Sequence, residues 1–175
     1  GLKEGAPCPV YGTEAVWEAI DDYPLEKGGV VALRDPLTIE GIRFEAFAVE
    51  HSTRCPAVGY RITAGVASIF YAPDLVYIEE REEALEGVKL YVGDGATLDQ
   101  YFVRKRGQHL IGHTPVRTQL TWCRKLGVPE AVITHCGSQI VEGDERRIKK
   151  RLREWGKERD VAVELAHDCM VKVLR

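Results

Sequence analysis

The chain has 175 residues, of which 45% are hydrophobic and 29% charged, and its formal net charge is -3. These totals are typical of one globular domain over residues 1–175, and the acidic balance excludes a general attraction to nucleic acid or to anionic membranes. No apolar run reaches the roughly 18 residues of a membrane span, and no signal segment opens the chain, so no membrane partner is expected.

The five cysteines are odd in number and scattered, with no CxxC pair. This pattern argues against a disulfide framework and indicates a reducing, cytoplasmic location. Cys136 directly follows a histidine and has two readings. It is either a metal ligand or a small buried apolar side chain, and the second reading is the commoner one for such a residue.

The first part of the chain predicts one short helix followed by strands. Residues 10–11 are typical of a short strand, and Thr13 is placed to cap a helix that runs to about Ile20. Runs of β-branched and aromatic residues then alternate with turn residues, which predicts mainly meandering antiparallel strands. These strands are expected at residues 30–33, 37–39, 42–49, 58–62 and 68–71.

The strand at residues 42–49 is expected to have one solvated face. Its charged residues, Arg43 and Glu45, alternate with apolar side chains, and a period of two is that of a half-buried strand. Residues 79–86 then predict a charged surface helix that is no more than a solvated face.

The next part of the sequence is where we expect the chemistry to be concentrated. An apolar strand at residues 89–92 is followed by a loop carrying His113, and a helix with apolar residues at helical spacing ends near Gly127. Residues 131–134 are typical of an interior strand, and His135 stands at its C-terminal end.

A long basic helix is predicted from Asp144 to about Arg159. Its run of arginines and lysines allows contact with phosphates, but its acids and periodic apolar residues favour an ordinary amphipathic surface helix. The acidic net charge and the lack of interleaved aromatic residues also weigh against a nucleic-acid binder. The chain closes with two strands, at residues 161–166 and 171–174, that predict a terminal hairpin.

Four of the five histidines and two aspartates follow predicted strands or lie in glycine-rich loops. Imidazole nitrogen and carboxylate oxygen are ligands for Zn²⁺ or Mn²⁺, and a carboxylate can bridge two ions. A lone histidine after a strand is usually structural, but with several histidines and two aspartates a metal site becomes as good a reading as a set of structural residues. His109, in a polar stretch, is expected only to be exposed. The six candidates are His51, Asp74, Asp94, His113, His135 and His167.

An ordered series of short segments resembles the C-terminal two-thirds of a metallo-β-lactamase-fold hydrolase, and within that superfamily the tRNase Z and cyclic-phosphodiesterase branch. The resemblance covers essentially the whole chain and implies an α/β fold, the αββα sandwich. It also implies two Zn or Mn ions that activate a bridging water for attack on a small phosphodiester or nucleotide-like substrate. The segments are VEHSTRCPAVGYRI, FYAPD, YVGDGAT, GHTPVRTQL, VITHCGSQIV and LAHDCM.

The resemblance also implies a role for each candidate residue. His51 and His135 would be terminal ligands of the first and the second metal, and Asp74 would bridge the two ions. His113 would act in acid–base catalysis, with Asp94 as its acidic partner. Three more residues would support the ligands without touching a metal: Ser138, His167 and Asp168.

One departure from the family pattern is large, because the signature His-x-His-x-Asp-His does not occur in this sequence. In relatives, the segment resembling GLKEGAPCPVYGTEAVW follows that signature almost directly, so the resemblance implies a hydrolase truncated at its N-terminus behind its main metal-binding loop. We therefore expect weak metal binding unless another chain supplies ligands, and a sheet completed by a partner segment or a second copy in a homo-oligomer. The alternative is a non-catalytic binding or assembly module that retains the scaffold without the loop.

Overall fold

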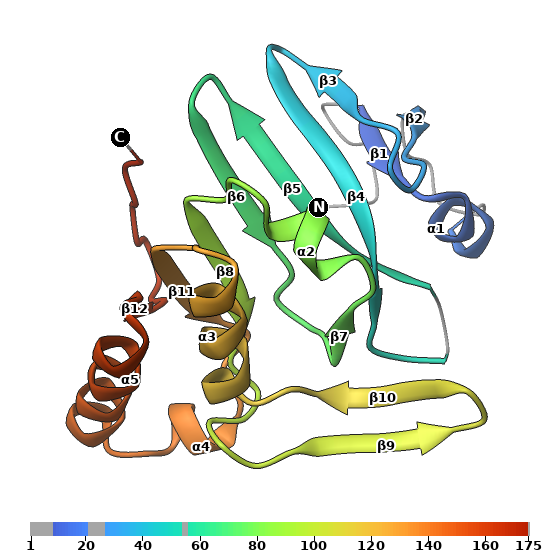
Figure 1. Cartoon of the computed structure of the whole chain (residues 1–175). Helices are drawn as coiled ribbons and strands as arrows, with labels where there is room; N and C mark the ends of the chain where they lie inside the picture. The colour runs from blue at the N-terminus through green and yellow to red at the C-terminus, as the bar shows by residue number, and fades with distance from the viewer. Residues whose placement is uncertain (1–8, 21–26, 54–55, 175) are drawn as a thin grey trace.

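The computed structural model describes residues 9–20, 27–53 and 56–174 (Figure 1). One eight-stranded mixed sheet organises this part of the chain, and seven of its strands lie in the order β12-β11-β8-β6-β5-β4-β3, while β7 pairs with β4. Its strands are β3 (Leu37–Ile39), β4 (Ile42–Glu50), β5 (Ala57–Ala64), β6 (Ala67–Tyr71), β7 (Tyr77–Ile78), β8 (Leu90–Asp94), β11 (Glu130–Thr134) and β12 (Ala162–Leu165).

The sheet has an antiparallel half and a parallel half. Strands β3 to β6 pair antiparallel, as the meander in the sequence predicts, whereas β6, β8, β11 and β12 pair parallel. Parallel strands end at the same edge of a sheet, and Thr134 of β11 pairs directly with Asp94 of β8. The loops after these strands are therefore neighbours, and they carry the candidate residues.

Helices cover one face of the parallel half and bury one contiguous core (Figure 1). The long helix α5 (Glu145–Arg159) begins as predicted, because the carboxylate of Asp144 accepts a hydrogen bond from the backbone N–H of Arg147 at 3.0 Å. Its apolar stripe is buried, which confirms an amphipathic surface helix. The other helices on the sheet are α2 (Arg81–Leu85), α3 (Val116–Lys125) and α4 (Ser138–Val141).

The N-terminal elements form a small unit of their own. Strand β1 (Val10–Gly12) pairs parallel with β2 (Lys27–Val30), and the predicted helix is present as α1 (Glu14–Ala19). The strand expected at residues 30–33 is displaced towards the N-terminus, and Leu33 makes only an isolated bridge to Ala46. The two-stranded sheet thus includes residues 27–29, which precede the expected strand.

The expectation of one solvated face on β4 is wrong at Glu45, whose side chain is buried. Arg61 donates to its carboxylate at 2.7 Å and Arg34 at 3.2 Å, and the guanidinium of Arg34 lies 4.3 Å from the ring centroid of Phe47. Arginines arriving from other segments therefore cover this face of the strand and neutralise the acid, which an alternating pattern within one strand does not reveal.

Three further expectations fail in this structure. The helix expected to be no more than a solvated face, α2, buries Ala84 and Leu85 in the core. The stretch around His113 is not a loop but a β-hairpin, made of β9 (Phe102–Arg106) and β10 (His109–His113), that projects from the body of the molecule (Figure 1). The terminal hairpin is absent, because β12 pairs parallel with β11 and residues 171–174 form no strand. Among the described helices, none is long and apolar enough to span a membrane.

Candidate metal centre

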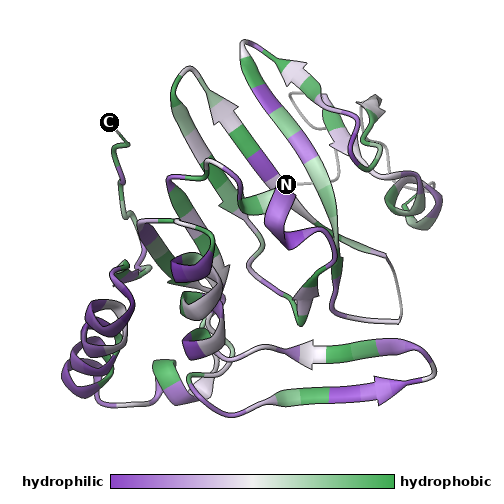
Figure 2. Cartoon of the chain, viewed as in Figure 1, coloured by the Kyte–Doolittle hydropathy of each residue, from purple (hydrophilic) through white to green (hydrophobic). Residues whose placement is uncertain are grey.

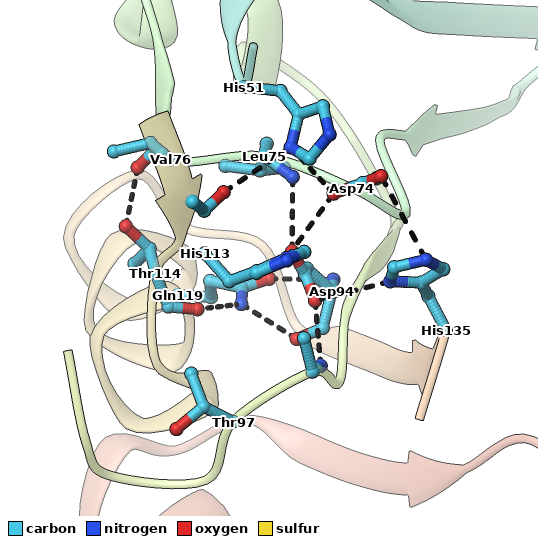
Figure 3. Close-up of polar contacts among 12 residues, drawn as sticks. His51, Asp74, Leu75, Val76, Asp94, Thr97, His113, Thr114, Gln119 and His135 are labelled. Carbon is cyan, nitrogen blue, oxygen red and sulfur yellow. Dashed lines mark hydrogen bonds and ion pairs between the residues drawn. The ribbon is translucent and has the colours of Figure 1, made fainter. Parts of the chain in front are cut away.

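Four side chains converge at one edge of the sheet, and each offers a ligand atom within 4.8 Å of the others: Asp74, Asp94, His113 and His135 (Figure 3). They come from segments far apart in the sequence. The two aspartates follow β6 and end β8, and the two histidines end β10 and follow β11. The sequence prediction that these residues meet is therefore consistent with the geometry, and the parallel pairing explains why.

Asp74 lies at the centre of this group. Its Oδ1 atom is 2.7 Å from Nδ1 of His51 and 3.2 Å from Nδ1 of His113, and its Oδ2 atom is 3.8 Å from Nε2 of His135. Although Oδ1 is buried, no hydrogen bond of suitable geometry to the described residues satisfies it. Two imidazoles beside a buried carboxylate oxygen that lacks a hydrogen bond, and a third imidazole beside the other oxygen of the same carboxylate, form a donor set that suits a divalent cation.

Asp94 is fully buried and is held by several donors. Its Oδ2 atom accepts a hydrogen bond from the backbone N–H of Leu75 at 3.0 Å, and its Oδ1 atom accepts one from the N–H of Ala96 at 2.7 Å. Nδ1 of His113 lies 2.9 Å from Oδ2. These contacts fix both oxygens, so the carboxylate can orient the His113 ring.

His51 stands at the margin of the group, with its ring centroid 5.4 Å from that of His113. Its backbone and its side chain both contact the end of β10. The backbone N–H of Gly112 donates to the carbonyl of His51 at 3.1 Å, and Nδ1 of His51 lies 3.3 Å from the carbonyl oxygen of Gly112. A cleft of about 320 Å³, which opens beside His51 between β4 and β10, gives room for a ligand next to the group.

The loops that carry Asp94 and His135 pack backbone against backbone. Gly95 donates to Thr134 at 2.7 Å, and Gly137 donates to Gly95 at 3.0 Å. A Cβ atom on Gly137 would lie 2.2 Å from a backbone oxygen, so only glycine permits this approach. His135 itself has a left-handed φ of 50°, a strained conformation for a histidine, and this turn places its ring beside the aspartates.

Sequence reasoning missed Gln119, a fully buried residue of α3. Its amide donates to the carbonyls of Asp94 and Thr114 at 2.8 Å, and its oxygen accepts from the N–H of Asp94 and the hydroxyl of Tyr91 at 2.9 Å (Figure 3). Gln119 therefore fixes the backbone of Asp94 through both its N–H and its carbonyl group. The signal in the sequence was a polar residue on the apolar stripe of the predicted helix.

The remaining candidates lie outside the group. Ser138 is the exposed first residue of α4, and His167 and Asp168 are exposed in the segment after β12. Cys136 is half-buried against the core, and burial, aided by the Asp94 carboxylate, raises the pKa of its thiol. This favours the reading as a buried apolar side chain. His109 is exposed, as expected.

Comparisons with known proteins agree with this architecture. The family model described as "Beta-lactamase superfamily domain" matches residues 2–136. A search of curated proteins found no match. Solved structures share the fold at low sequence identity, and the first two described below are longer proteins, of which this chain spans about three-fifths.

Three of these structures illustrate the likeness. The metallo-beta-lactamase fold protein YhfI from Bacillus subtilis has a TM-score of 0.67 and 19% identity, over 90% of this chain and 61% of that one. A diphosphatase of the PhnP family has a TM-score of 0.61 and 16% identity, over 95% and 58% of the two chains. Human tRNase Z, short form, has a TM-score of 0.59 and 17% identity, over 99% and 70%.

Proposed function

We propose that this chain, which belongs to the β-lactamase superfamily and has the metallo-β-lactamase fold, acts as a metal-dependent phosphodiesterase. The observation that carries the proposal is the buried Oδ1 atom of Asp74, which lies between His51 and His113 without a hydrogen bond of suitable geometry. A buried carboxylate oxygen in this state is stabilised by positive charge beside it, which a bound divalent cation would supply.

The donor set suits Zn²⁺ or Mn²⁺, because it offers imidazole nitrogens and carboxylate oxygens. In our assignment Asp74, His51 and His135 would hold the ions. Ions bound there would supply Lewis-acid polarisation of the scissile group and activation of a water. Further ligands are needed for two firmly held ions, because these three side chains do not fill two tetrahedral sites.

The pair of His113 and Asp94 provides the acid–base chemistry in this proposal. With its proton on Nδ1, the His113 ring donates a hydrogen bond to Asp94, which leaves Nε2 to exchange a proton with the substrate. When Nε2 carries a proton as well, the buried carboxylate stabilises the imidazolium, and His113 can then protonate the leaving oxygen. Asp94 keeps the ring oriented throughout.

Support for a phosphodiester comes from the neighbours in fold. One is described as a diphosphatase, one as a tRNase Z and a third as yeast PDE1, which has a TM-score of 0.55 and 18% identity. These descriptions hold for those proteins, and we extend only the shared chemistry to this chain.

The single contiguous core supports one domain, and the free cysteines support the cytoplasm as its location.

The experiment that tests the proposal combines metal analysis with an assay. The chain is purified without chelator, its metal content is measured by elemental analysis, and hydrolysis of bis(p-nitrophenyl) phosphate is followed with added Zn²⁺ or Mn²⁺. We expect up to about two ions per chain and hydrolysis that Asp74→Ala abolishes. Absence of both metal and hydrolysis in the parent chain would contradict the proposal and favour a non-catalytic binding module.

A further inference from the structure

The hairpin of β9 and β10 carries an exposed basic stretch that the proposed chemistry does not use. Arg104, Lys105 and Arg106 are consecutive and exposed, and in the described part of the chain no carboxylate lies within ion-pair distance of them. Figure 2 shows this stretch as the hydrophilic distal part of β9. Unpaired surface cations in a row form a local positive field even though the whole chain is acidic.

The register of the hairpin decides which of these cations faces the metal centre. Residues directly opposite each other in an antiparallel pair share a face, and the face alternates along each strand. Phe102 pairs with His113, Arg104 pairs with Ile111, and Arg106 pairs with His109. The two arginines therefore lie on the same face of the hairpin as His113. Lys105 pairs with Leu110 and lies on the opposite face.

These side chains form a row that leads away from the site. A strand rises about 3.3 Å per residue, so Arg104 stands about 7 Å and Arg106 about 13 Å along the hairpin from the Phe102–His113 pair. A substrate whose scissile group sits at His113 can therefore place further anionic groups on the two arginines only if it is an extended chain.

The root of the hairpin is fixed relative to the site. Glu50 accepts a hydrogen bond from the backbone N–H of Leu110 at 3.2 Å, and Gly112 exchanges contacts with His51. The hydrogen bond of Leu110 uses the backbone edge of β10, and the His109 side chain, on the same face as the two arginines, lies 3.9 Å from Glu50. The row of arginines is thus held in one direction from His113.

Two exposed aromatic side chains stand at the same root. Phe102 is 49% exposed and Tyr101 is 65% exposed, and the Tyr101 hydroxyl is held by Thr118 at 2.7 Å. Exposed aromatics beside a row of cations are the combination that binds single-stranded nucleic acid by stacking bases and pairing phosphates. The turn at Gly107 and Gln108 is polar, which argues against insertion of this hairpin into a membrane.

We propose that the substrate of this site is a single-stranded oligonucleotide, with Arg104 and Arg106 binding phosphates beyond the scissile one and Phe102 stacking on a base. The identity of the reaction rests on the proposed phosphodiesterase function, whereas binding by the hairpin does not. The acidic net charge of the whole chain argued against a nucleic-acid partner. That argument does not apply to the hairpin, because the hairpin concentrates cations locally.

The test measures binding without turnover. Fluorescence anisotropy follows a labelled oligodeoxythymidylate of about 12 nucleotides, long enough to cover one site of this kind, in EDTA and over a series of salt concentrations. The parent chain should bind, and the double variant Arg104→Gln/Arg106→Gln should lose about 1.4 from the slope of log affinity against log salt, at about 0.7 for each phosphate contact. Phe102→Leu should weaken binding roughly tenfold through lost stacking.

Lys105→Gln is the matched control, because it removes the same charge from the opposite face of the same strand. It should leave the slope within experimental error of the parent value. Equal losses for Lys105→Gln and for the single variant Arg104→Gln would overturn the proposal, since they would show unspecific attraction to the hairpin. All these residues are exposed, and circular dichroism of each variant would check that it keeps the parent fold.

Competition separates an oligonucleotide from a free nucleotide. If ATP displaces the labelled strand as well as an unlabelled strand of equal phosphate concentration does, the site binds polyphosphates and the oligonucleotide assignment fails. Oligonucleotide binding without hydrolysis of bis(p-nitrophenyl) phosphate would overturn the phosphodiesterase function alone. Hydrolysis without oligonucleotide binding would overturn the inference about the hairpin alone.

Discussion

Nδ1 of His113 lies 2.9 Å from Oδ2 of Asp94, a carboxylate that has no exposed surface and also accepts two backbone hydrogen bonds. The histidine itself is only partly buried, so the pair joins a fixed acid to a ring that can reach a substrate. The same ring also lies 3.2 Å from Asp74. His113 therefore has two possible roles, as an acid–base residue or as a metal ligand, and these roles predict different results.

Replacing His113 with alanine should distinguish the acid–base role from the role of metal ligand. If the residue exchanges protons with the substrate, His113→Ala should lower kcat by about 10²- to 10⁴-fold and leave the metal content of the chain unchanged. Turnover is measured with bis(p-nitrophenyl) phosphate and metal by elemental analysis on the same sample. Turnover equal to that of the parent would exclude the catalytic role, and a parallel loss of metal would make His113 a ligand.

Replacing His135 with alanine should instead lower metal occupancy. Its Nε2 atom lies 3.8 Å from Asp74 and its Nδ1 atom 3.7 Å from Asp94, and the loss of a ligand typically weakens a site by far more than tenfold. His109→Ala is the control, because this exposed histidine lies on the hairpin about 13 Å along the strand from His113. Occupancy that is the same in both variants would remove His135 from the site.

The sequence indicated the residues that converge in space better than it indicated the strands that carry them. His51, Asp74 and His135 follow strands that were expected, and an apolar run followed by a polar residue is a local signal that survives folding. The parallel pairing of β8 with β11 then brings Asp94 and the loop of His135 together. Nothing in one segment shows this pairing, but the fold named by the resemblance does.

The failures have a common cause, which is that partners from distant segments decide the outcome. The hairpin was missed because its strand β9 is mostly charged and exposed, so it shows no apolar alternation, and only Gly107 marks its turn. Glu45 was assigned to a solvated face because its neutralising partners, Arg34 and Arg61, lie on other segments. Gln119 was missed for the same reason, because its hydrogen-bond partners at Asp94 and Tyr91 lie on β8.

Gly112 should be intolerant of substitution, because it joins the hairpin to His51. Its φ is 121°, and a Cβ atom would lie 1.7 Å from the carbonyl oxygen of Phe102. Gly112→Ala should therefore lower the free energy of unfolding by about 3 kcal/mol or more and reduce metal affinity through His51.

Gly107→Ala is the matched control, since its φ of 63° is also left-handed but no atom lies within 4 Å of the added Cβ. It should cost only about 1 kcal/mol, and an equal loss of stability in the two variants would refute the steric argument.

The stability of the chain should depend on pH through Glu45. Burial acts to raise the pKa of this carboxyl, but the hydrogen bond and charge of Arg61, with the charge of Arg43, outweigh it and lower the pKa below 4.5. A lowered pKa in the folded state means that the ion pairs stabilise the protein fully above the unfolded pKa and are lost as the pH falls through the folded value.

Glu45→Gln should therefore cost about 1.5–3 kcal/mol of unfolding free energy at neutral pH and progressively less below about pH 4.5. Denaturant unfolding at several pH values measures this, with Glu154→Gln, which removes an exposed pair with Lys150, as a control expected to change stability by less than about 0.5 kcal/mol. A cost for Glu45→Gln that is independent of pH would show that its charge is not what the arginines stabilise.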